Sequence, residues 1–262
     1  MWTDALLDFV ARYASGGLQS LAVGGAVLLI TRRLLRRPLS ARRIRVRGHK
    51  MDAKQVRHEV KHTLIAGLFS ATQVFFLLHL EERGAVRMPE GLGPWGWPGT
   101  LATIFGLVLF NDLWFYGCHR LLHTRWLFRR VHSVHHGSID VNPLTSYSFH
   151  IVEVALLTGW LIPVALIVPL PLTALLVMQI IGLVNNMMSH LGFELLPSGW
   201  LRWPVLRWSN TATFHSLHHQ RFNGNYGLQT RVWDRLFGTE IPGYEEAFAD
   251  AHASSRELKT SP

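Results

Sequence analysis

Cysteine and charged side chains are both scarce in this chain. Cys118 is its one cysteine, which excludes an intramolecular disulfide and a cysteine-rich metal site, and we expect it to pack between helices. Charged residues make up 16% of the sequence, against roughly 25% in soluble domains. Carboxylates are rarest between residues 119 and 219, where only Asp140, Glu153 and Glu194 occur. That region cannot supply the glutamate ligands of soluble di-iron helical bundles.

Long apolar runs take the place of charge. Residues 63–80 and 100–117 are each about long enough to cross a bilayer. Residues 151–188 are also largely apolar, and Pro169 and Pro171 divide them. This pattern predicts two spans joined by a tight turn.

A further apolar element lies near the start of the chain. Residues 5–30 are largely apolar, with Asp8 and Arg12 as interruptions. Met1–Val10 lacks the basic residues that open a secretory signal peptide. We therefore expect this first span to stay in the mature protein.

The formal net charge of +9 is concentrated in one segment. Nine arginines and three lysines lie between residues 32 and 61. The segment separates two apolar runs and has no interleaved aromatic residues, so we expect no nucleic-acid partner. Positive charge beside membrane spans marks the cytoplasmic side. The segment is therefore predicted to be a cytoplasmic loop.

Histidine is abundant and clustered. Ten of the fifteen histidines lie between residues 119 and 219; eight of these stand in pairs or triplets, and a ninth, His190, follows Asn186 at the same four-residue spacing. Imidazole suits iron, zinc, copper or nickel at pH 7. Nine imidazoles exceed the roughly four ligands of one zinc ion, which favours two metals held close together. The nine predicted ligands are His119, His123, His132, His135, His136, His190, His215, His218 and His219.

The spacing of these histidines repeats. An H-x-x-H-H pattern occurs at His132–His136 and again at His215–His219. Residues three or four apart share one face of a helix, so each pattern points several imidazoles in one direction. Two copies of one pattern are not explained by packing alone. They predict a metal site dominated by imidazole.

Four other residues are candidates for supporting roles. His150 stands alone and is a candidate ligand, base or packing residue. Asn186 lies four residues before His190, where a pair would have its first histidine. It is a candidate ligand, a hydrogen-bond partner of the metal site or a polar contact between helices, and we favour the hydrogen-bonding role. Asp112 and Glu153 are candidates to orient histidine N–H groups.

The predicted spans place every histidine cluster on one face of the membrane. If residues 32–61 are cytoplasmic, the spans at 63–80 and 100–117 lead out and back, and the hairpin at 151–188 does the same. We therefore expect an all-α, multi-pass membrane protein with about four spans, the last two a helical hairpin. A cytosolic helical cap would carry the clusters. The chain would then divide into an N-terminal membrane segment (1–98), a catalytic domain (99–242) and a C-terminal tail (243–262).

The flanks of the clusters carry a specific pattern over about residues 107–239. The matching stretches are DLWFYGCHRLLH at 112–123, residues 132–142 followed by SFHIVE at 148–153, HLGFELLP at 190–197 and NYGLQTRVWDRLFGT at 225–239. Together they resemble the fatty acid hydroxylase superfamily, which includes sterol desaturases and sphingolipid hydroxylases. Ser148 stands where the family usually has arginine, and Ile151 where it has proline.

This resemblance implies a function. Members are integral membrane oxygenases in which two iron ions activate O2 to attack an unactivated C–H bond of a sterol, fatty acyl chain or sphingolipid. The outcome is hydroxylation, or desaturation when a second hydrogen is removed. Zinc can replace the iron in a recombinant preparation. Because the chain has no H-P-G-G heme segment, we expect a separate electron donor of ferredoxin or cytochrome b5 type.

Two alternatives stay open at this point. A carotenoid hydroxylase or ketolase would use a related histidine pattern. A histidine-rich metal transporter would place its ligands inside spans near the midplane, whereas these clusters follow the spans. Composition rich in arginine, alanine and leucine suggests a bacterial inner membrane, with the active site on its cytoplasmic face.

Overall fold

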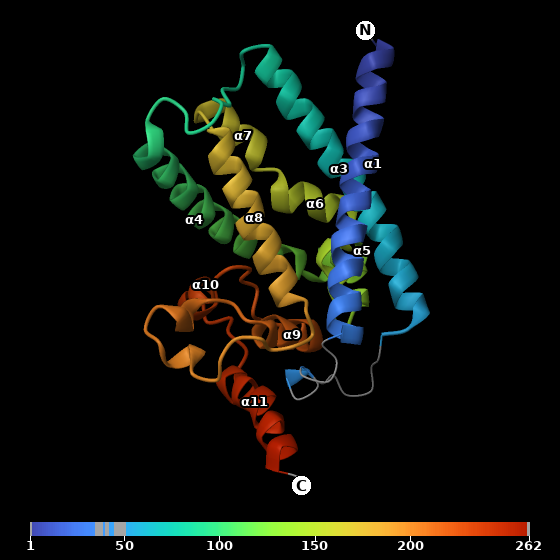
Figure 1. Ribbon diagram of the computed structural model, residues 1–262, viewed down its shortest axis with the longest axis vertical. Coiled ribbons are helices and arrows are strands. Elements are labelled where there is room, and N and C mark those ends of the chain that lie inside the picture. Colours follow the sequence, from blue (N-terminus) through green and yellow to red (C-terminus); the bar gives the residue numbers. More distant parts are fainter. Residues whose placement is uncertain (1, 35–38, 40–41, 45–50, 261–262) are drawn as a thin grey trace.

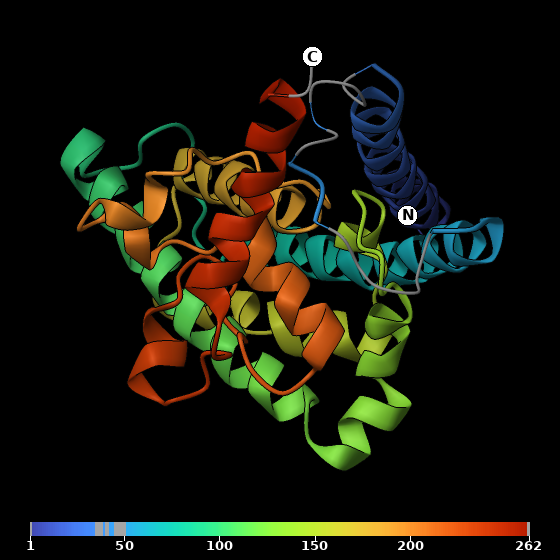
Figure 2. The same cartoon turned by 90° about the horizontal axis from the view of Figure 1, so that it is seen from below.

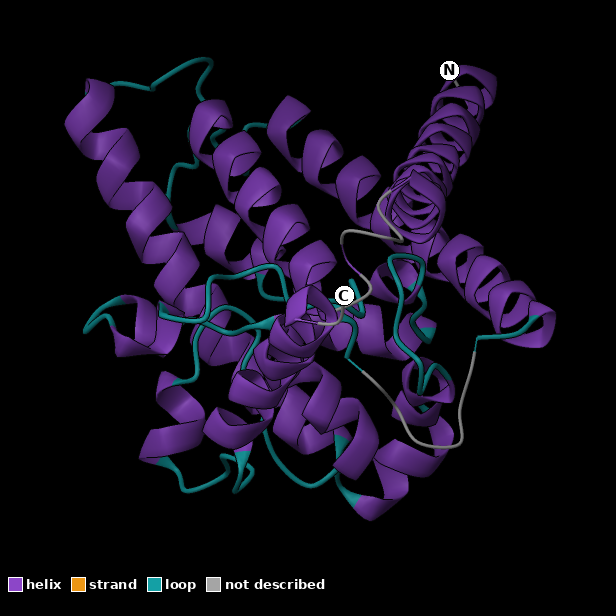
Figure 3. Ribbon diagram, turned by 60° about the horizontal axis from the view of Figure 1, so that its bottom comes forward, coloured by secondary structure: helices purple, strands orange, loops and turns teal. Residues whose placement is uncertain are grey.

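The computed structural model describes residues 2–34, 39, 42–44 and 51–260. Helices predominate throughout this part of the chain (Figure 3), which holds two isolated β-bridges and no strand. Long helices form a bundle, shorter ones form a cap below it, and the two termini lie at opposite ends (Figure 1). The predicted all-α class is confirmed.

Four helices in the described residues are long and apolar enough to cross a membrane. At most 28% of the apolar window of each is buried inside the protein, so most of their apolar surface faces outward, where lipid can cover it. The predicted multi-pass membrane fold is thereby confirmed. The four helices are α1 (Trp2–Leu29), α3 (Ala53–Glu82), α4 (Gly96–Leu122) and α8 (Leu172–Ser189).

The basic segment is described only in part. After α1 the chain continues as a π-helical turn, Ile30–Leu34. Arg32 and Arg43 lie 3.7 and 3.2 Å from the carboxylate of Asp140, so the segment contacts the loop after the first H-x-x-H-H pattern. Its residues Arg36, Arg37, Arg45, Arg47 and Lys50 lie outside the described residues.

The predicted hairpin forms, but its first arm is broken. That arm consists of two short helices, α6 (Ile151–Thr158) and α7 (Leu161–Ile167), and the second arm is α8. Pro163 has no N–H to donate to the carbonyl of Gly159. The α-helical hydrogen-bond pattern is therefore interrupted there, and α6 and α7 do not form one continuous helix. The first arm is therefore shorter than the four spans.

The hairpin returns the chain to the end from which it left. The N–H of Leu170 in its turn donates to the carbonyl of Arg87 at 2.9 Å, which holds the turn against the loop between α3 and α4. That loop lies at the end of the bundle away from the cap (Figure 1). His150 before the hairpin and His190 after it therefore lie at the cap end.

The cap closes the lower end of the bundle, as the view from below shows (Figure 2). The side chain of Thr211 accepts the N–H of Phe214 at 3.1 Å and starts α9. Phe214 packs with Tyr244 and Phe248 in an apolar core, which fixes α11 to α9. The helical segments of the cap and its connections are α5 (Arg125–Arg130), His132–Gly137, Thr145–Tyr147, Trp200–Arg202, Leu206–Trp208, α9 (Ala212–Arg221), α10 (Val232–Leu236) and α11 (Tyr244–Thr260).

Candidate metal centre

The structure brings all nine clustered histidines together. Within the described residues they form two groups, in each of which one nitrogen of every ring lies within 4.8 Å of the others. We call them the five-histidine group and the four-histidine group. The first contains His119, His123, His132, His136 and His218, and the second contains His135, His190, His215 and His219.

Each H-x-x-H-H motif contributes to both groups. The outer pair of the first motif, His132 and His136, joins the five-histidine group, and the outer pair of the second, His215 and His219, joins the four-histidine group. The middle histidine of each motif joins the opposite group. This crossing places the groups in contact, with the rings of His136 and His219 only 4.5 Å apart between centroids.

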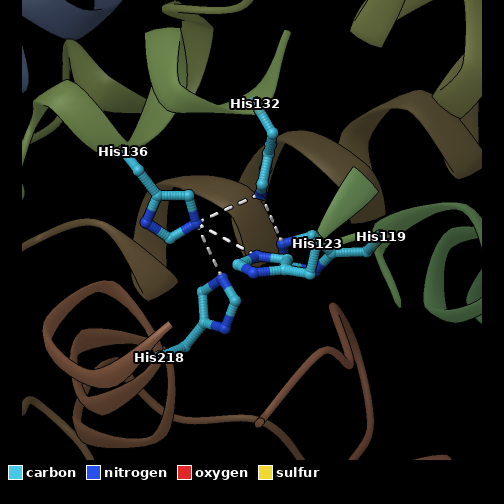
Figure 4. Close-up of side chains that lie close together, drawn as sticks. All are labelled: His119, His123, His132, His136 and His218. Atoms are coloured by element: carbon cyan, nitrogen blue, oxygen red, sulfur yellow. Dashed lines mark hydrogen bonds between the residues drawn. The ribbon is translucent and has the colours of Figure 1, made fainter. Parts of the chain in front are cut away.

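The ring nitrogens of the five-histidine group point toward one another (Figure 4). The Nε2 atom of His136 lies 3.2 Å from that of His123 and 3.1 Å from those of His132 and His218. Two nitrogens bound to one ion at about 2.1 Å lie roughly 3.0–3.4 Å apart at coordination angles of about 90–109°. The spacing therefore fits ligands of a shared metal ion.

The four-histidine group has the same spacing. The Nε2 atom of His215 lies 2.9 Å from that of His190 and 3.1 Å from that of His219, and the Nε2 atoms of His190 and His135 are 3.4 Å apart. Four neutral imidazoles with converging lone pairs repel one another unless a cation lies between them. The donor set thus fits a metal in both groups.

Backbone carbonyls orient four of these nine rings. Nδ1 of His119 lies 2.8 Å from the carbonyl oxygen of Tyr226, and Nδ1 of His218 lies 2.6 Å from that of Gly224. A ring that donates its Nδ1–H to a carbonyl keeps the Nε2 lone pair free for a metal. His135 and His190 pair in the same way with the carbonyls of Ser148 and Asn186, at 3.2 and 2.8 Å.

The loop at residues 224–227 is shaped to present two of those carbonyls. A Cβ added at Gly224 would lie 2.4 Å from the carbonyl oxygen of Thr239, so a larger residue does not fit. The carboxylate of Asp234 accepts the N–H groups of Tyr226 and Gly227 at 2.8 and 2.7 Å. The C-terminal pattern N-Y-G…W-D thus forms a wall of the metal centre, a role that sequence reasoning did not assign.

Glu153 lies where it can orient a histidine, as the sequence suggested. Its Oε1 accepts the Nδ1–H of His132 at 2.7 Å, and both side chains are 1% exposed. A carboxylate on the far nitrogen raises the basicity of a metal-binding imidazole. Glu153 therefore supports the five-histidine group.

Replacing Glu153 with leucine should weaken metal binding in the five-histidine group. Loss of such a partner typically costs about 10–100-fold in metal affinity, and Glu153→Gln should lose less because its amide oxygen still accepts the N–H. Competition with a chelator measures both. Glu82→Gln, at a side chain 78% exposed, is the control. Equal affinities in Glu153→Leu and the control would contradict this role.

Asp112 does not orient a histidine, contrary to the sequence-based prediction. Its carboxylate accepts the N–H groups of Gln229 and Thr230, the hydroxyl of Thr230 and the indole N–H of Trp233, at 2.6–3.2 Å. Seven residues before His119, it shares that face of α4 but lies about 10 Å away along the axis. Asp112 instead holds residues 229–233 against α4.

The side chains of His150 and Asn186 both hydrogen-bond to backbone groups. His150 caps α6, where its Nδ1 accepts the N–H of Val152 at 3.2 Å, and it belongs to neither group. Asn186 donates its side-chain N–H to the carbonyl of Ser146 at 2.6 Å. Its own carbonyl holds His190, so it supports the four-histidine group through its backbone.

Glu59 is a supporting residue that the sequence analysis missed. This fully buried carboxylate on α3 accepts hydrogen bonds at 2.7–3.0 Å from Ser138, Asn142 and Thr145, as well as from Gln55. It anchors the loop that follows the first H-x-x-H-H motif. Its partners on that loop are 79–86 residues away in sequence, and no local spacing signals them.

Burial keeps the clustered histidines neutral. It lowers the pKa of His123, which neighbouring His119 lowers further, to about 2, and it lowers the pKa of His190 to about 4. The pKa values of His135 and His219 also fall well below 6.5, through burial and then through nearby histidines. Neutral imidazoles are the form that binds metal.

Metal-free protein should therefore lose stability in mild acid. An unfolded histidine takes up a proton near pH 6.5, whereas these folded histidines resist doing so. Their contribution is present above pH 6.5 and is lost as pH falls from 6.5 toward 4, by several kcal/mol in total. Thermal unfolding of chelator-treated protein across this range measures it, with metal-loaded protein as the control. A constant melting temperature between pH 7 and pH 5 would contradict the prediction.

A cavity of about 180 Å³ opens from the histidines into the bundle. Rings of both groups form one end, including His119 and His215, and α4, α6 and α8 form its sides. Between the helices Phe115, Leu157 and Gly182 give it an apolar wall, which the polar residues Asn111, Thr158 and Asn186 interrupt. The cavity can therefore hold an apolar chain next to the metal centre.

Comparison with known proteins identifies the family. The profile described as fatty acid hydroxylase matches residues 104–239, more than half of the chain. The chain belongs to the fatty acid hydroxylase family. The match covers all nine clustered histidines, most of α4, the hairpin and the loop at 224–227, so the site described above lies within the family domain.

Similar members of the family act on lipids, by their names. Human lathosterol oxidase is 29% identical over 71% of this chain and 61% of its own length. Rat methylsterol monooxygenase 1 is 30% identical over 68% and 56%. The very-long-chain aldehyde decarbonylase GL1-7 of Oryza sativa subsp. japonica is 34% identical over 59% and 25%. The matched region thus spans at most about three fifths of these relatives, and no solved structure matches the chain.

Proposed function

We propose that this protein is a membrane-bound non-heme di-iron oxygenase that hydroxylates or desaturates an unactivated C–H bond of a lipid. The observation that carries the proposal is the junction of two histidine groups with an apolar cavity between spans. Family membership and the lipid-oxidising relatives support it. A sterol, a fatty acyl chain and a sphingolipid are all substrates of suitable chemistry.

The nine histidines would hold the iron, five in one group and four in the other. Bound iron supplies the redox chemistry that activates O2, which amino-acid side chains cannot perform. The protein orients the ligands through the carbonyls of Tyr226 and Gly224 and through Glu153. The cavity wall, including Phe115 and Leu157, excludes water and presents an alkyl segment to the imidazole-lined end.

The histidine clusters between residues 119 and 219 would then lie on the cytoplasmic face of a bacterial inner membrane. The basic segment at 32–61 supports this orientation. There, a separate donor of ferredoxin or cytochrome b5 type would deliver electrons to the cap. On this view residues 1–98 are a membrane segment, 99–242 the catalytic domain and 243–262 an accessory tail that contains α11.

Lipid analysis of cells with and without the gene tests the proposal. Cells with the wild-type gene should accumulate one lipid class with a mass gain of one oxygen, or a mass loss of two hydrogens. His135→Ala, which removes a ligand of the four-histidine group, should abolish the change, and His79→Ala, at a half-exposed side chain on α3, should preserve it. A product that persists in His135→Ala would refute the proposal.

A further inference from the structure

One side of the cap is strongly apolar although it lies outside the spans. It is formed by residues 203–208 and by 232–237. Among its side chains, Val205 is 79% exposed, Leu236 67% and Trp203 64%. An exposed apolar patch of this kind marks a surface that associates with a membrane or with another protein. We call it the collar surface.

The two segments of the collar surface form one unit. The N–H of Arg231 donates to the carbonyl of Trp208 at 2.8 Å. Ser209 and Thr230 pair in an isolated β-bridge. The guanidinium groups of Arg207 and Arg235 both lie over the Trp208 ring, at 5.8 and 5.3 Å from its centroid.

This unit lies alongside a membrane span. The ring of Phe237 stacks on Tyr116 of α4 with centroids 5.5 Å apart, and the indole of Trp233 donates to Asp112. These α4 residues lie six and ten positions before its end at Leu122, about 9 and 15 Å along the helix. Both ribbon views show α10 beside the lower part of α4 (Figures 1 and 2). The collar surface is thus continuous with an apolar helix that lipid must cover.

The charge of the collar surface is positive. The sequence has no acidic residue between Glu194 and Asp234, and both of these are fully buried. Arg207 and Arg235 therefore provide its charge, and Arg202 lies next to it in sequence. Glu240, 3.8 Å from Arg235, is held at 2.7 Å by the buried Arg231. Tryptophan beside arginine at the end of a span is typical of the headgroup zone of a bilayer.

We propose that the collar surface binds the headgroup zone of an anionic phospholipid bilayer. Trp203, Val205 and Leu236 insert among the first methylenes of the acyl chains, and Arg207 and Arg235 contact lipid phosphates. The cap is thereby held against the bilayer on the α4 side. This interaction is independent of what the metal centre catalyses.

Spin labels at single cysteines test the insertion. In the Cys118→Ser background, full-length protein in nanodiscs carries Val205→Cys or Leu236→Cys. Leu113→Cys on α4 is the lipid-facing control, and Ala249→Cys, exposed on α11, is the aqueous control. We expect positions 205 and 236 to be accessible to lipid-soluble O2 and shielded from a water-soluble nickel reagent. Accessibility like that of position 249 would overturn the proposal, and shielding from both reagents, as a protein partner would cause, would overturn it too.

Headgroup charge is tested separately. A fluorophore at position 205 should be quenched at least twofold more by brominated phosphatidylglycerol than by brominated phosphatidylcholine. Removal of one interfacial arginine weakens anionic-lipid binding by about fivefold, so Arg207→Gln/Arg235→Gln should abolish the excess. Arg83→Gln/Arg87→Gln, at the other end of the bundle, should keep it. Equal quenching by the two lipids when Arg207 and Arg235 are both present would refute the choice of anionic lipid.

Discussion

Replacing His218 with alanine is expected to remove metal from the five-histidine group, and replacing its neighbour His219 to remove metal from the four-histidine group. The two residues are adjacent in sequence, yet their rings serve different groups. Each variant should retain about one metal per chain. Each should lose lipid oxidation by more than about 100-fold, because the groups act as a unit.

Elemental analysis and Mössbauer spectra of iron-loaded protein check this result. The two variants should retain spectroscopically different iron sites, since one keeps the four-histidine group intact and the other the five-histidine group. His79→Ala should keep the wild-type spectrum. Identical residual spectra in His218→Ala and His219→Ala would contradict the division into two groups.

Replacing Asp112 with alanine is expected to destabilise the protein by about 3–5 kcal/mol. The change would leave two backbone N–H groups, a hydroxyl and an indole N–H without their buried acceptor, and each such loss costs about 1–3 kcal/mol before relaxation. Asp112→Asn retains one acceptor oxygen and should cost about half as much. Metal binding should weaken as well, because the segment that Asp112 holds continues from the loop presenting the Tyr226 carbonyl.

Thermal unfolding in nanodiscs measures the loss for both Asp112 variants. Asn185→Ala is a matched control, because the Asn185 side chain donates to the carbonyl of Ile181 in its own helix. An Asp112→Ala variant as stable as this control would show that the clamp between α4 and residues 229–233 contributes little.

Much of the fold follows from the length of apolar runs. A run of 18 or more apolar residues has few alternatives to a membrane helix, and α3 and α4 extend the runs predicted at 63–80 and 100–117. The broken first arm of the hairpin was not predicted. Hydropathy does not indicate the break, because Gly159 and Pro163 are both compatible with an apolar run. The missing N–H of the proline explains it once the structure is known.

The candidate site was predictable where its signal is local. Spacing selected eight of the nine histidines of the two groups, and the resemblance of its flanking residues supported His190. Spacing could not divide them, because the division depends on how four separate segments face one another: the end of α4, residues 132–137, the end of α8 and α9. The role of Asp112 was predicted wrongly for a similar reason. Residues that share a helix face point in the same direction, but they can lie far apart along the helix axis.

Hydrogen-bond partners that are distant in sequence could not be predicted. The carbonyls of Tyr226 and Gly224 have no side-chain signature, and Glu59 bonds to a loop about 80 residues away. Such contacts depend on tertiary structure, so only the assembled bundle reveals them.

The number of iron ions bound per chain tests the two-metal centre most directly. Protein purified after iron-replete expression and analysed by elemental analysis should contain two, with fewer in His135→Ala and His218→Ala. A wild-type value well below two that neither substitution changes would contradict the two-metal centre.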